Sequence, residues 1–350
     1  MYRRYVLKRL INAVIMYAII LIAISAIFNF SAEKTIRQDI NEQIKAESLR
    51  VLKSGTMKAS QIEEWKSKRQ IELEHRNWLD RPFVAKVFYR AYKAFTFQYG
   101  NSMSIRSSKG DRSVWKILLE VIPRSMMLYT SEFIIVTIIA IAIGLKMARK
   151  PGGFLDRSVS FLALAFQGLP IWWVGMVFLF LFAYTLKLVP SGGLSSLPKP
   201  PGFLGFLDLL WHIALPLFTL VFVGIWGSAY YIRQIVLGTM NEDFIMAARA
   251  RGLSEQKILY KHTLRSAAPP IVTQVLLGFL VSLTGGMIIF EGIFSFPGLG
   301  KLYYVALQQN DLAVVMGDTS ISIFLFMSGL VILDFIYGLL DPRIKVGGKA

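Results

Sequence analysis

The sequence predicts an all-α membrane protein, and three observations support this. Hydrophobic residues make up 54% of the 350-residue chain and the mean hydropathy is +0.51, whereas soluble domains are usually about 45–50% apolar. The apolar residues are concentrated in six runs of about 20 residues or more, the length at which a helix crosses a hydrocarbon core of ~30 Å. Cysteine is absent, which excludes disulfides and thiolate metal sites.

The six apolar runs are each expected to form a transmembrane helix. They cover residues 10–30, 126–145, 159–186, 211–237, 271–290 and 319–340. Pro170 and Pro216 lie inside the third and fourth runs, where proline is expected to kink the helix because it lacks an N–H donor. The first run is longer than the 7–15 apolar residues of a signal peptide, so we interpret it as a retained helix.

The charge distribution predicts the orientation of the chain. The formal net charge is +17, which in a soluble protein would indicate nucleic-acid binding. In membrane proteins, Lys and Arg accumulate in cytoplasmic loops instead. Short segments on the side of the two termini hold 17 Lys and Arg residues, against 3 on the other side. We therefore expect a multi-pass protein of the cell membrane, embedded in the lipid bilayer, with both termini cytoplasmic and no nucleic-acid partner.

Four regions follow from this pattern: the N-terminus with the first helix (1–30), an extracytoplasmic insert (31–123), a five-helix core (124–345) and a short tail (346–350). In the insert, Ile36, Ile40 and Ile44 recur at a helical period. The insert is also rich in aromatic residues, which favours two or three packed helices over a disordered segment.

A polar segment at 238–268 separates the fourth and fifth apolar runs. Asn241 is expected to cap a helix, and Glu242 and Asp243 suit its positive end. Gly252 is expected to end that helix, because a left-handed C-terminal residue is unstrained when it is glycine. Ser254 is expected to cap a second short helix through about residue 264. Such a segment could present a rigid surface to a soluble partner; the alternative is an ordinary connection, although most span only 2–8 residues.

This segment resembles the cytoplasmic coupling loop of ATP-binding-cassette importer permeases, whose pattern is Glu-Ala-Ala-x₃-Gly-x₉-Ile-x-Leu-Pro. The residues that match in register are Ala247, Ala248, Gly252 and Leu264. Met246 replaces the Glu of the pattern and Arg265 replaces its Pro. These departures fit the dipeptide/oligopeptide-type branch, whose loop is similar to Glu-Asp-Tyr-x₃-Ala-Arg-Ala-Lys-Gly-Leu-Ser; residues 242–244 and 248–254 follow it closely.

Other segments resemble the same branch in the expected order. They lie at 79–82, 99–102, 169–172, 190–193, 294–300 and 340–343. The long loop after the first apolar run is typical of the B-type subunit of these importers. The resemblance implies a type I importer permease core that forms half of a translocation path. It also implies a second, homologous permease as heterodimer partner, two cytoplasmic ATPase subunits and an extracytoplasmic solute-binding protein.

The resemblance implies a transport subunit rather than an enzyme. The chain lacks the Gly-x₄-Gly-Lys-Ser/Thr phosphate loop, so ATP and Mg²⁺ are expected on the partner ATPase subunits and no cofactor, metal or catalytic site on this chain. The expected substrate is a short peptide or an oligosaccharide. The alternative functions are a stand-alone secondary transporter or channel, which would need an intramembrane ion site or inverted repeats, and a membrane-embedded enzyme, for which no catalytic arrangement is evident.

Three groups of candidate site residues follow. The resemblance implies that the ATPase-coupling residues are Glu242, Asp243, Ala247, Ala248, Arg249, Arg251, Gly252 and Leu253. Candidates for the translocation path are the polar or aromatic residues of the spans, namely Glu132, Trp172, Gln274 and Glu291. Intramembrane carboxylates usually face a cavity or a partner, whereas Gln274 also suits a bond between helices and Trp172 an aromatic anchor. Candidates for an outer gate are Pro297, Gly298 and Gly300.

Overall fold

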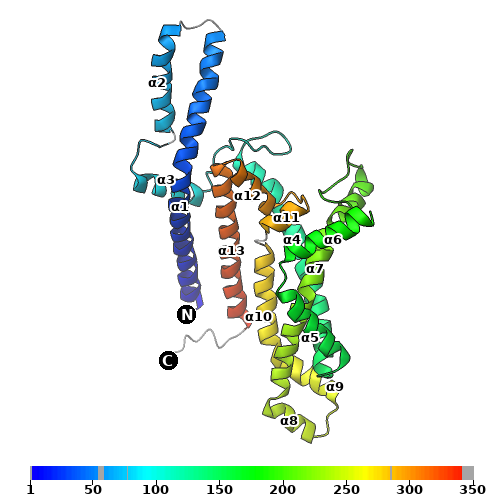
Figure 1. The fold of residues 1–350 in the computed structure, drawn as a ribbon. Helices are drawn as coiled ribbons and strands as arrows, with labels where there is room; N and C mark the ends of the chain where they lie inside the picture. Colours follow the sequence, from blue (N-terminus) through cyan, green and yellow to red (C-terminus); the bar gives the residue numbers. More distant parts are fainter. Residues whose placement is uncertain (1, 54–58, 77, 284–285, 341–350) are drawn as a thin grey trace. The chain divides into compact units, whose positions relative to one another are not determined.

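The computed structural model describes residues 2–53, 59–76, 78–283 and 286–340 (Figure 1). The described chain is almost entirely helical. It divides into two compact units, one built from the described parts of Met1–Leu118 and Val305–Val331, the other from those of Leu119–Tyr304 and Ile332–Asp341. The predicted tail at 346–350 and the motif residues Asp341, Pro342 and Arg343 lie outside the described residues.

Five described helical segments are long and apolar enough to cross a membrane. They are Leu7–Asn29, Val114–Arg149, Gly202–Met240, Glu255–Leu283 and Leu312–Phe335. A bent pair, Phe154–Gln167 and Ile171–Thr185, makes a sixth if it is counted as one span. The expected helix over 159–186 is therefore broken, with a bend of 101°. Pro170 stands at the break and a new helix begins after it, whereas Pro216 lies inside an unbroken helix.

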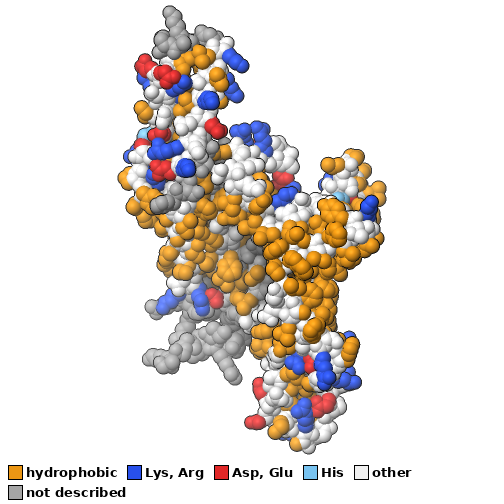
Figure 2. Space-filling model, in the orientation of Figure 1, with side chains coloured by type: hydrophobic (Ala, Val, Ile, Leu, Met, Phe, Trp, Pro, Cys, Tyr) orange, Lys and Arg blue, Asp and Glu red, His pale blue; other side chains and the backbone are white. Residues whose placement is uncertain are grey.

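The first unit begins with three helices, α1 (Tyr2–Lys53), α2 (Ala59–Arg76) and α3 (Phe83–Phe95) (Figure 1). Helix α1 continues well beyond residue 30, because no glycine or proline interrupts it there. Its upper half pairs with α2 through a cluster of buried side chains: Ile36, Ile40, Ile44, Leu73 and Leu79. The helical period predicted for the three isoleucines is thus confirmed, and Figure 2 shows charged side chains over the outside of this helix pair.

Helix α3 packs against the end of the first apolar run. The hydroxyl of Ser25 on α1 donates a hydrogen bond of 2.9 Å to the carbonyl oxygen of Val87 on α3. The ammonium of Lys86, which is buried, donates to Oε2 of Glu33 at 2.8 Å. Because a buried cation needs a partner, this ion pair determines which face of α3 lies against α1.

The remaining elements belong to the second unit or are shared between the two units. They are α4 (Val114–Arg149), α5 (Phe154–Gln167), α6 (Ile171–Phe178), η1 (Leu179–Thr185), α7 (Gly202–Met240), α8 (Asp243–Ala250), α9 (Glu255–Lys257), η2 (Ile258–Thr263), α10 (Leu264–Leu283), α11 (Ile288–Ile293), α12 (Leu299–Gln308) and α13 (Leu312–Leu340). The elements η1 and η2 are π-helices. Helices α4, α12 and α13 contribute residues to both units.

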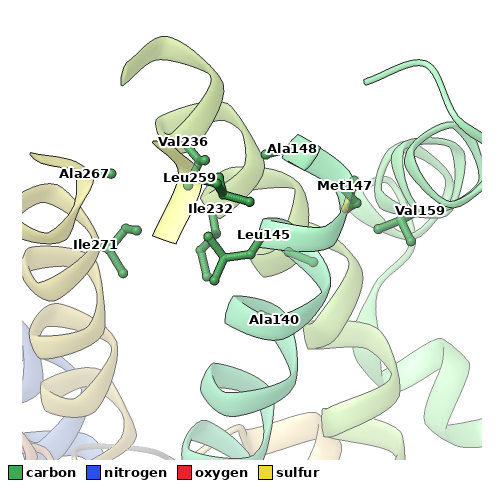
Figure 3. Close-up of a cluster of buried hydrophobic side chains, with 11 residues drawn as sticks. Ala140, Leu145, Met147, Ala148, Val159, Ile232, Val236, Leu259, Ala267 and Ile271 are labelled. Carbon is green, nitrogen blue, oxygen red and sulfur yellow. The ribbon is translucent and has the colours of Figure 1, made fainter. Parts of the chain in front are cut away.

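A buried hydrophobic cluster joins several of these helices at one end of the second unit (Figure 3). It includes Met147 and Ala148 of α4, Ile232 of α7, Leu259 of η2 and Ile271 of α10. Burial of apolar side chains at about 25 cal/mol per Å² is the dominant stabilising term for such a cluster where water reaches the unfolded chain. The π-helix η2, in the second half of the polar segment, is therefore packed into the same core as the long helices.

An ion pair between α5 and α7 supports this end of the unit. The guanidinium of Arg233 donates two hydrogen bonds to the carboxylate of Asp156, one of them from Nη2 to Oδ2 at 2.8 Å. The amide of Gly152 donates to the same oxygen at 2.8 Å. Asp156 is buried, so its charge is compensated by a fork of the kind that arginine forms with carboxylates.

Candidate functional site

The polar segment folds into one short helix, α8, and the beginning of a second helix, with Gly252 between them; we call residues 243–263 the elbow. The second helix continues without a break from Glu255 to Leu283, so the prediction that it ends at about residue 264 is wrong. Gly252 has φ +75°, and its amide donates to the carbonyl of Arg249 at 2.9 Å. The amide of Leu253 donates to the carbonyl of Ala248 at 3.4 Å. These two bonds form a Schellman motif, in which a left-handed residue ends the helix. The prediction that Gly252 ends the first helix is confirmed.

The caps of the elbow were predicted correctly in one case and wrongly in the other. Ser254 caps the second helix, with its Oγ accepting a hydrogen bond of 3.4 Å from the amide of Lys257. Asn241 does not cap α8, because α7 extends to Met240 and Asn241 is the residue that closes α7. The residue that precedes α8 is Glu242, and its side chain makes no capping bond.

The elbow has a small core of its own. Ile245, Ala248 and Ile258 are buried, and Leu253 packs against them. The contact between Leu253 and this cluster is the apolar contact that commonly accompanies a Schellman motif. Ala248 therefore points into the elbow, whereas Ala247 is exposed. Of the two alanines predicted to contact a partner, only Ala247 is accessible on the surface of this chain.

The outer face of the elbow combines apolar and charged side chains. Phe244 and Met246 are 41% and 62% exposed. The charged residues that were predicted to contact the ATPase are exposed as well: Glu242, Asp243, Arg249 and Arg251. Arg249 is held by Glu255, with Nε donating to Oε1 at 2.8 Å. Figure 2 shows charged side chains of both signs, interspersed with hydrophobic ones, over the α8 end of the second unit.

A second constellation lies around Glu291 of α11, which is fully buried. Its Oε1 accepts hydrogen bonds from the hydroxyls of Ser125 at 3.0 Å and Tyr129 at 3.1 Å. Its Oε2 accepts from the amide of Lys301 at 3.0 Å. Ser125 in turn accepts from the amide of Leu299 at 2.8 Å. The carboxylate therefore connects α4 to the start of α12.

Two of the three predicted gate residues, Pro297 and Gly298, lie in the loop between α11 and α12, and Gly300 lies at the start of α12. A Cβ atom added to Gly298 would stand 2.6 Å from Oε2 of Glu291 and closer still to Oγ of Ser125. One added to Gly300 would stand 2.7 Å from the carbonyl carbon of Met287. The carbonyl oxygen of Pro297 accepts from Nη1 of Arg124 at 3.4 Å. The structure thus brings Glu291 and the gate residues together, in one packed turn that admits only glycine at two positions.

Ser125 and Tyr129 were missed in the sequence. Their spacing of four residues places both side chains on one face of a helix, but a serine and a tyrosine in an apolar run are equally compatible with ordinary helix packing. Glu291 was predicted to line the translocation path. It is enclosed by its own chain instead, and its oxygens hold the adjacent loop in place.

The other predicted path residues do not gather at one point. Glu132 is half-buried on α4, and a Cβ added to Gly224 of α7 would stand 3.1 Å from its Oε1. Trp172 is half-buried on α6, and Gln274 is exposed on α10. Among the described residues, no hydrogen bond joins any two of these three side chains.

Several helices long enough to cross a membrane, with a structured polar segment between two of them, define the class of multi-span membrane proteins. The family model described as "Binding-protein-dependent transport system inner membrane component" matches residues 140–346, and the chain belongs to this family. It is a multi-pass inner-membrane permease subunit of an ATP-binding-cassette importer, of the peptide-type branch, and it works with ATPase and solute-binding partners. Membership of this family argues against the two alternative functions, a stand-alone transporter or channel and a membrane-embedded enzyme.

Named relatives agree with the family. The oligopeptide transport system permease protein AppB of Bacillus subtilis is 32% identical over 66% of this chain and 72% of its own length. The dipeptide transport system permease protein DppB of the same organism is 32% identical over 80% of this chain and 85% of its own. Among solved structures, the inward facing MetNI methionine ABC transporter has a TM-score of 0.44 at 18% identity, over 66% of this chain and 95% of that one.

Proposed function

We propose that this chain forms one half of the path of a peptide importer and that its elbow is the surface on which an ATPase subunit docks. The proposal rests on how the elbow is built. A Schellman turn at Gly252 and a small hydrophobic core within the elbow stabilise its fold. Phe244, Met246 and Ala247 form an exposed face on it. An apolar centre with a charged rim is the usual anatomy of a protein interface.

The connection of the elbow to the spans supports a mechanical role. Ile258 belongs to the core of the elbow, and its neighbour Leu259 belongs to the cluster that contains α4, α7 and α10 residues. Both side chains are essentially fully buried. Because packed cores transmit displacement rather than absorb it, a movement of the docked elbow would be passed to three long helices through two consecutive residues.

Replacement of Gly252 tests the coupling. In Gly252→Val, the β-branched side chain opposes the left-handed backbone at φ +75°, so the Schellman turn should open. Gly238→Val is the matched control, because a Cβ at Gly238 meets nothing within 4 Å and no left-handed φ is present there. In proteoliposomes with the whole importer and its loaded binding protein, Gly252→Val should lose most of the substrate-stimulated ATPase activity and Gly238→Val should keep it. Stimulation by the Gly252→Val importer equal to wild type would overturn the docking role.

We propose short peptides as the substrate, with a second permease as heterodimer partner and two ATPase subunits. The names of the relatives, oligopeptide and dipeptide permeases, support this choice; none of them points to an oligosaccharide. Uptake of radiolabelled dipeptides and pentapeptides, with maltotriose as the sugar control, would decide the class. Sugar uptake without peptide uptake would contradict the proposal, and the subunit ratio of the purified complex would test the assembly.

We further propose that both termini and the elbow are cytoplasmic and that the α1–α2 hairpin lies outside. The chain has no native cysteine, so single cysteines report topology directly. Met246 is 62% exposed on the elbow, and the Lys68 side chain is 75% exposed on α2. A membrane-impermeant maleimide added to spheroplasts should label Lys68→Cys and spare Met246→Cys until the cells are lysed. The reverse pattern would invert the orientation.

A further inference from the structure

The first unit contains a cavity of about 270 Å³ that the transport role leaves unassigned. Its lining comes from the end of the first apolar run (Phe28), the α2–α3 connection (Trp78), helix α3 (Tyr89, Arg90 and Lys93) and segments near residues 98–103 and 312–316. No Asp or Glu is among the described residues that line it, whereas Arg76, Arg90 and Lys93 all are. The cavity is therefore cationic, and its size is near the lower end for small-ligand sites.

Two cations of this cavity, Arg90 and Lys93, form no ion pair with a carboxylate in the part of the chain that the structure describes. The carboxylate whose field reaches Arg90 is that of Glu33, and it is already engaged by Lys86 at 2.8 Å and Arg37 at 3.1 Å. Burial lowers the pKa of the Arg90 guanidinium, as expected of a desolvated cation that lacks a partner.

One wall of the cavity is held in a strained conformation. Trp78 has φ +61°, a left-handed backbone that is an outlier for a bulky residue. Its indole stacks on the ring of Tyr89, with centroids 3.8 Å apart and planes 9° from parallel. The ammonium of Lys93 stands 4.7 Å from the centre of the same Tyr89 ring. The stacked rings thus form a flat aromatic surface beside the ammonium of Lys93.

The cavity lies beside the end of the membrane-spanning part of α1, where the membrane meets water. Phe28 lies within the last residues of the candidate span Leu7–Asn29, and the bond from Ser25 fastens α3 to the same turn. The outward side of α3 is apolar, since Val84, Phe88 and Tyr92 are 62%, 54% and 62% exposed at a spacing of four residues. A helix with one apolar exposed face and nearby cations is typical of elements that lie in the headgroup region.

We propose that this cavity binds the phosphate-bearing headgroup of an anionic membrane lipid. Arg90 and Lys93 would meet the phosphate, since guanidinium groups form paired hydrogen bonds to phosphate oxygens and lysine supplies a point charge. The Trp78–Tyr89 stack would lie along the glycerol region, where amphipathic rings are favoured. The exposed face of α3 would lie against the acyl chains of the same leaflet. The bound lipid would fasten α3 and the base of the α1–α2 hairpin to the membrane surface.

Lipid retention by the intact importer tests the proposal. The importer, purified from mixed micelles with equal phosphatidylglycerol and phosphatidylcholine, should retain phosphatidylglycerol several-fold in excess in native mass spectrometry. The variant Arg90→Gln with Lys93→Gln should reduce this excess about tenfold, because each Lys or Arg near an anionic surface contributes substantially to attraction. The charge-matched control is Arg50→Gln with Lys68→Gln, two exposed positions outside the cavity, and it should retain the excess.

Three outcomes would overturn the proposal. The first is equal retention of the two lipids by the unaltered chain, a measurement that does not depend on any variant folding. The second is an unchanged excess in the Arg90→Gln, Lys93→Gln variant. The third is displacement of phosphatidylglycerol by millimolar inorganic phosphate, which would make this a site for free phosphate. Arg90→Lys, which keeps the charge, should preserve the preference.

Discussion

The hydroxyl of Ser125 on α4 donates a hydrogen bond of 3.0 Å to Glu291, a residue 166 positions further along the chain. The same hydroxyl accepts from the amide of Leu299, so a single serine connects a buried carboxylate to the turn that follows it. These hydrogen bonds give residues 294–300 a defined conformation. Among the described residues, Glu291 has no charged partner.

Replacing Glu291 with glutamine should destabilise this loop. The amide nitrogen of Gln is a donor, and it would face a hydroxyl or a backbone amide that now donates to the carboxylate. A buried donor left without an acceptor costs about 1–3 kcal/mol. We expect a lower thermal midpoint and faster amide exchange at residues 294–302 by hydrogen–deuterium exchange. Glu64→Gln, in an exposed ion pair of α2, is the control and should change the exchange of this loop little. Unaltered protection of residues 294–302 in Glu291→Gln would refute the anchoring role.

The two neighbouring alanines of the elbow should respond differently to the same enlargement. Ala248→Leu adds atoms to the closed cluster of Ile245 and Ile258, and overpacking of this kind costs about 1–3 kcal/mol. Ala247→Leu adds them to an exposed face and should leave the elbow folded. Amide exchange of 243–263 should therefore rise only in Ala248→Leu, while the amount of co-purified ATPase should fall in both. A normal ATPase yield with Ala247→Leu would show that this face is not the docking surface.

The ion pair between Asp156 and Arg233 should be sensitive to removal of either partner. Asp156→Ala leaves the guanidinium of Arg233, largely enclosed by the chain, without its carboxylate. Breaking a buried pair in this way is expected to cost roughly 3–5 kcal/mol. The double replacement Asp156→Ala with Arg233→Met should recover a large part of that loss. Thermal unfolding of the four species forms a double-mutant cycle, and strictly additive losses would argue against the pairing.

The ion pair between Glu33 and Lys86 predicts a pH dependence of the first unit. The hydrogen bond from Lys86 holds the pKa of the Glu33 carboxyl below its usual value. A depressed folded pKa contributes stability that is present above the unfolded pKa, near 4.3 for glutamate, and is lost as the pH falls through the lower folded value. Thermal midpoints should therefore drop as the pH falls below about 4.3, and Glu33→Gln should flatten that part of the curve. An identical acid response in Glu33→Gln would exclude Glu33 as its source.

Prediction from the sequence succeeded where structure depends on neighbouring residues. The Schellman turn at Gly252 and the cap at Ser254 involve bonds between residues at most five positions apart, so the local chemistry predicts them. Asn241 shows the limit of such reasoning. Its side chain suits a cap, but α7 extends to Met240, three residues beyond the apolar run that ends at residue 237, and Asn241 closes that helix instead.

Distant contacts account for what could not be predicted. From the sequence, Glu291 is an intramembrane carboxylate that could line a path or anchor a loop. Its contacts with Ser125 and Tyr129 decide between the two roles. No local sequence pattern indicates that these residues lie close to Glu291. The cationic cavity depends in the same way on Phe28, Arg90 and Met316, which come from three separate helices.

The sequence by itself determined the membrane class, five of the six predicted spans, the turn at Gly252 and the cap at Ser254, because hydrophobic length, helical period and capping act over a few residues. Only the tertiary structure decided which of the two elbow alanines is accessible, that Glu291 is enclosed, and that Trp78 and Arg90 share one cavity. These properties arise when helices from distant parts of the chain pack together. Packing decides whether a polar group meets water, lipid or a hydrogen-bond partner.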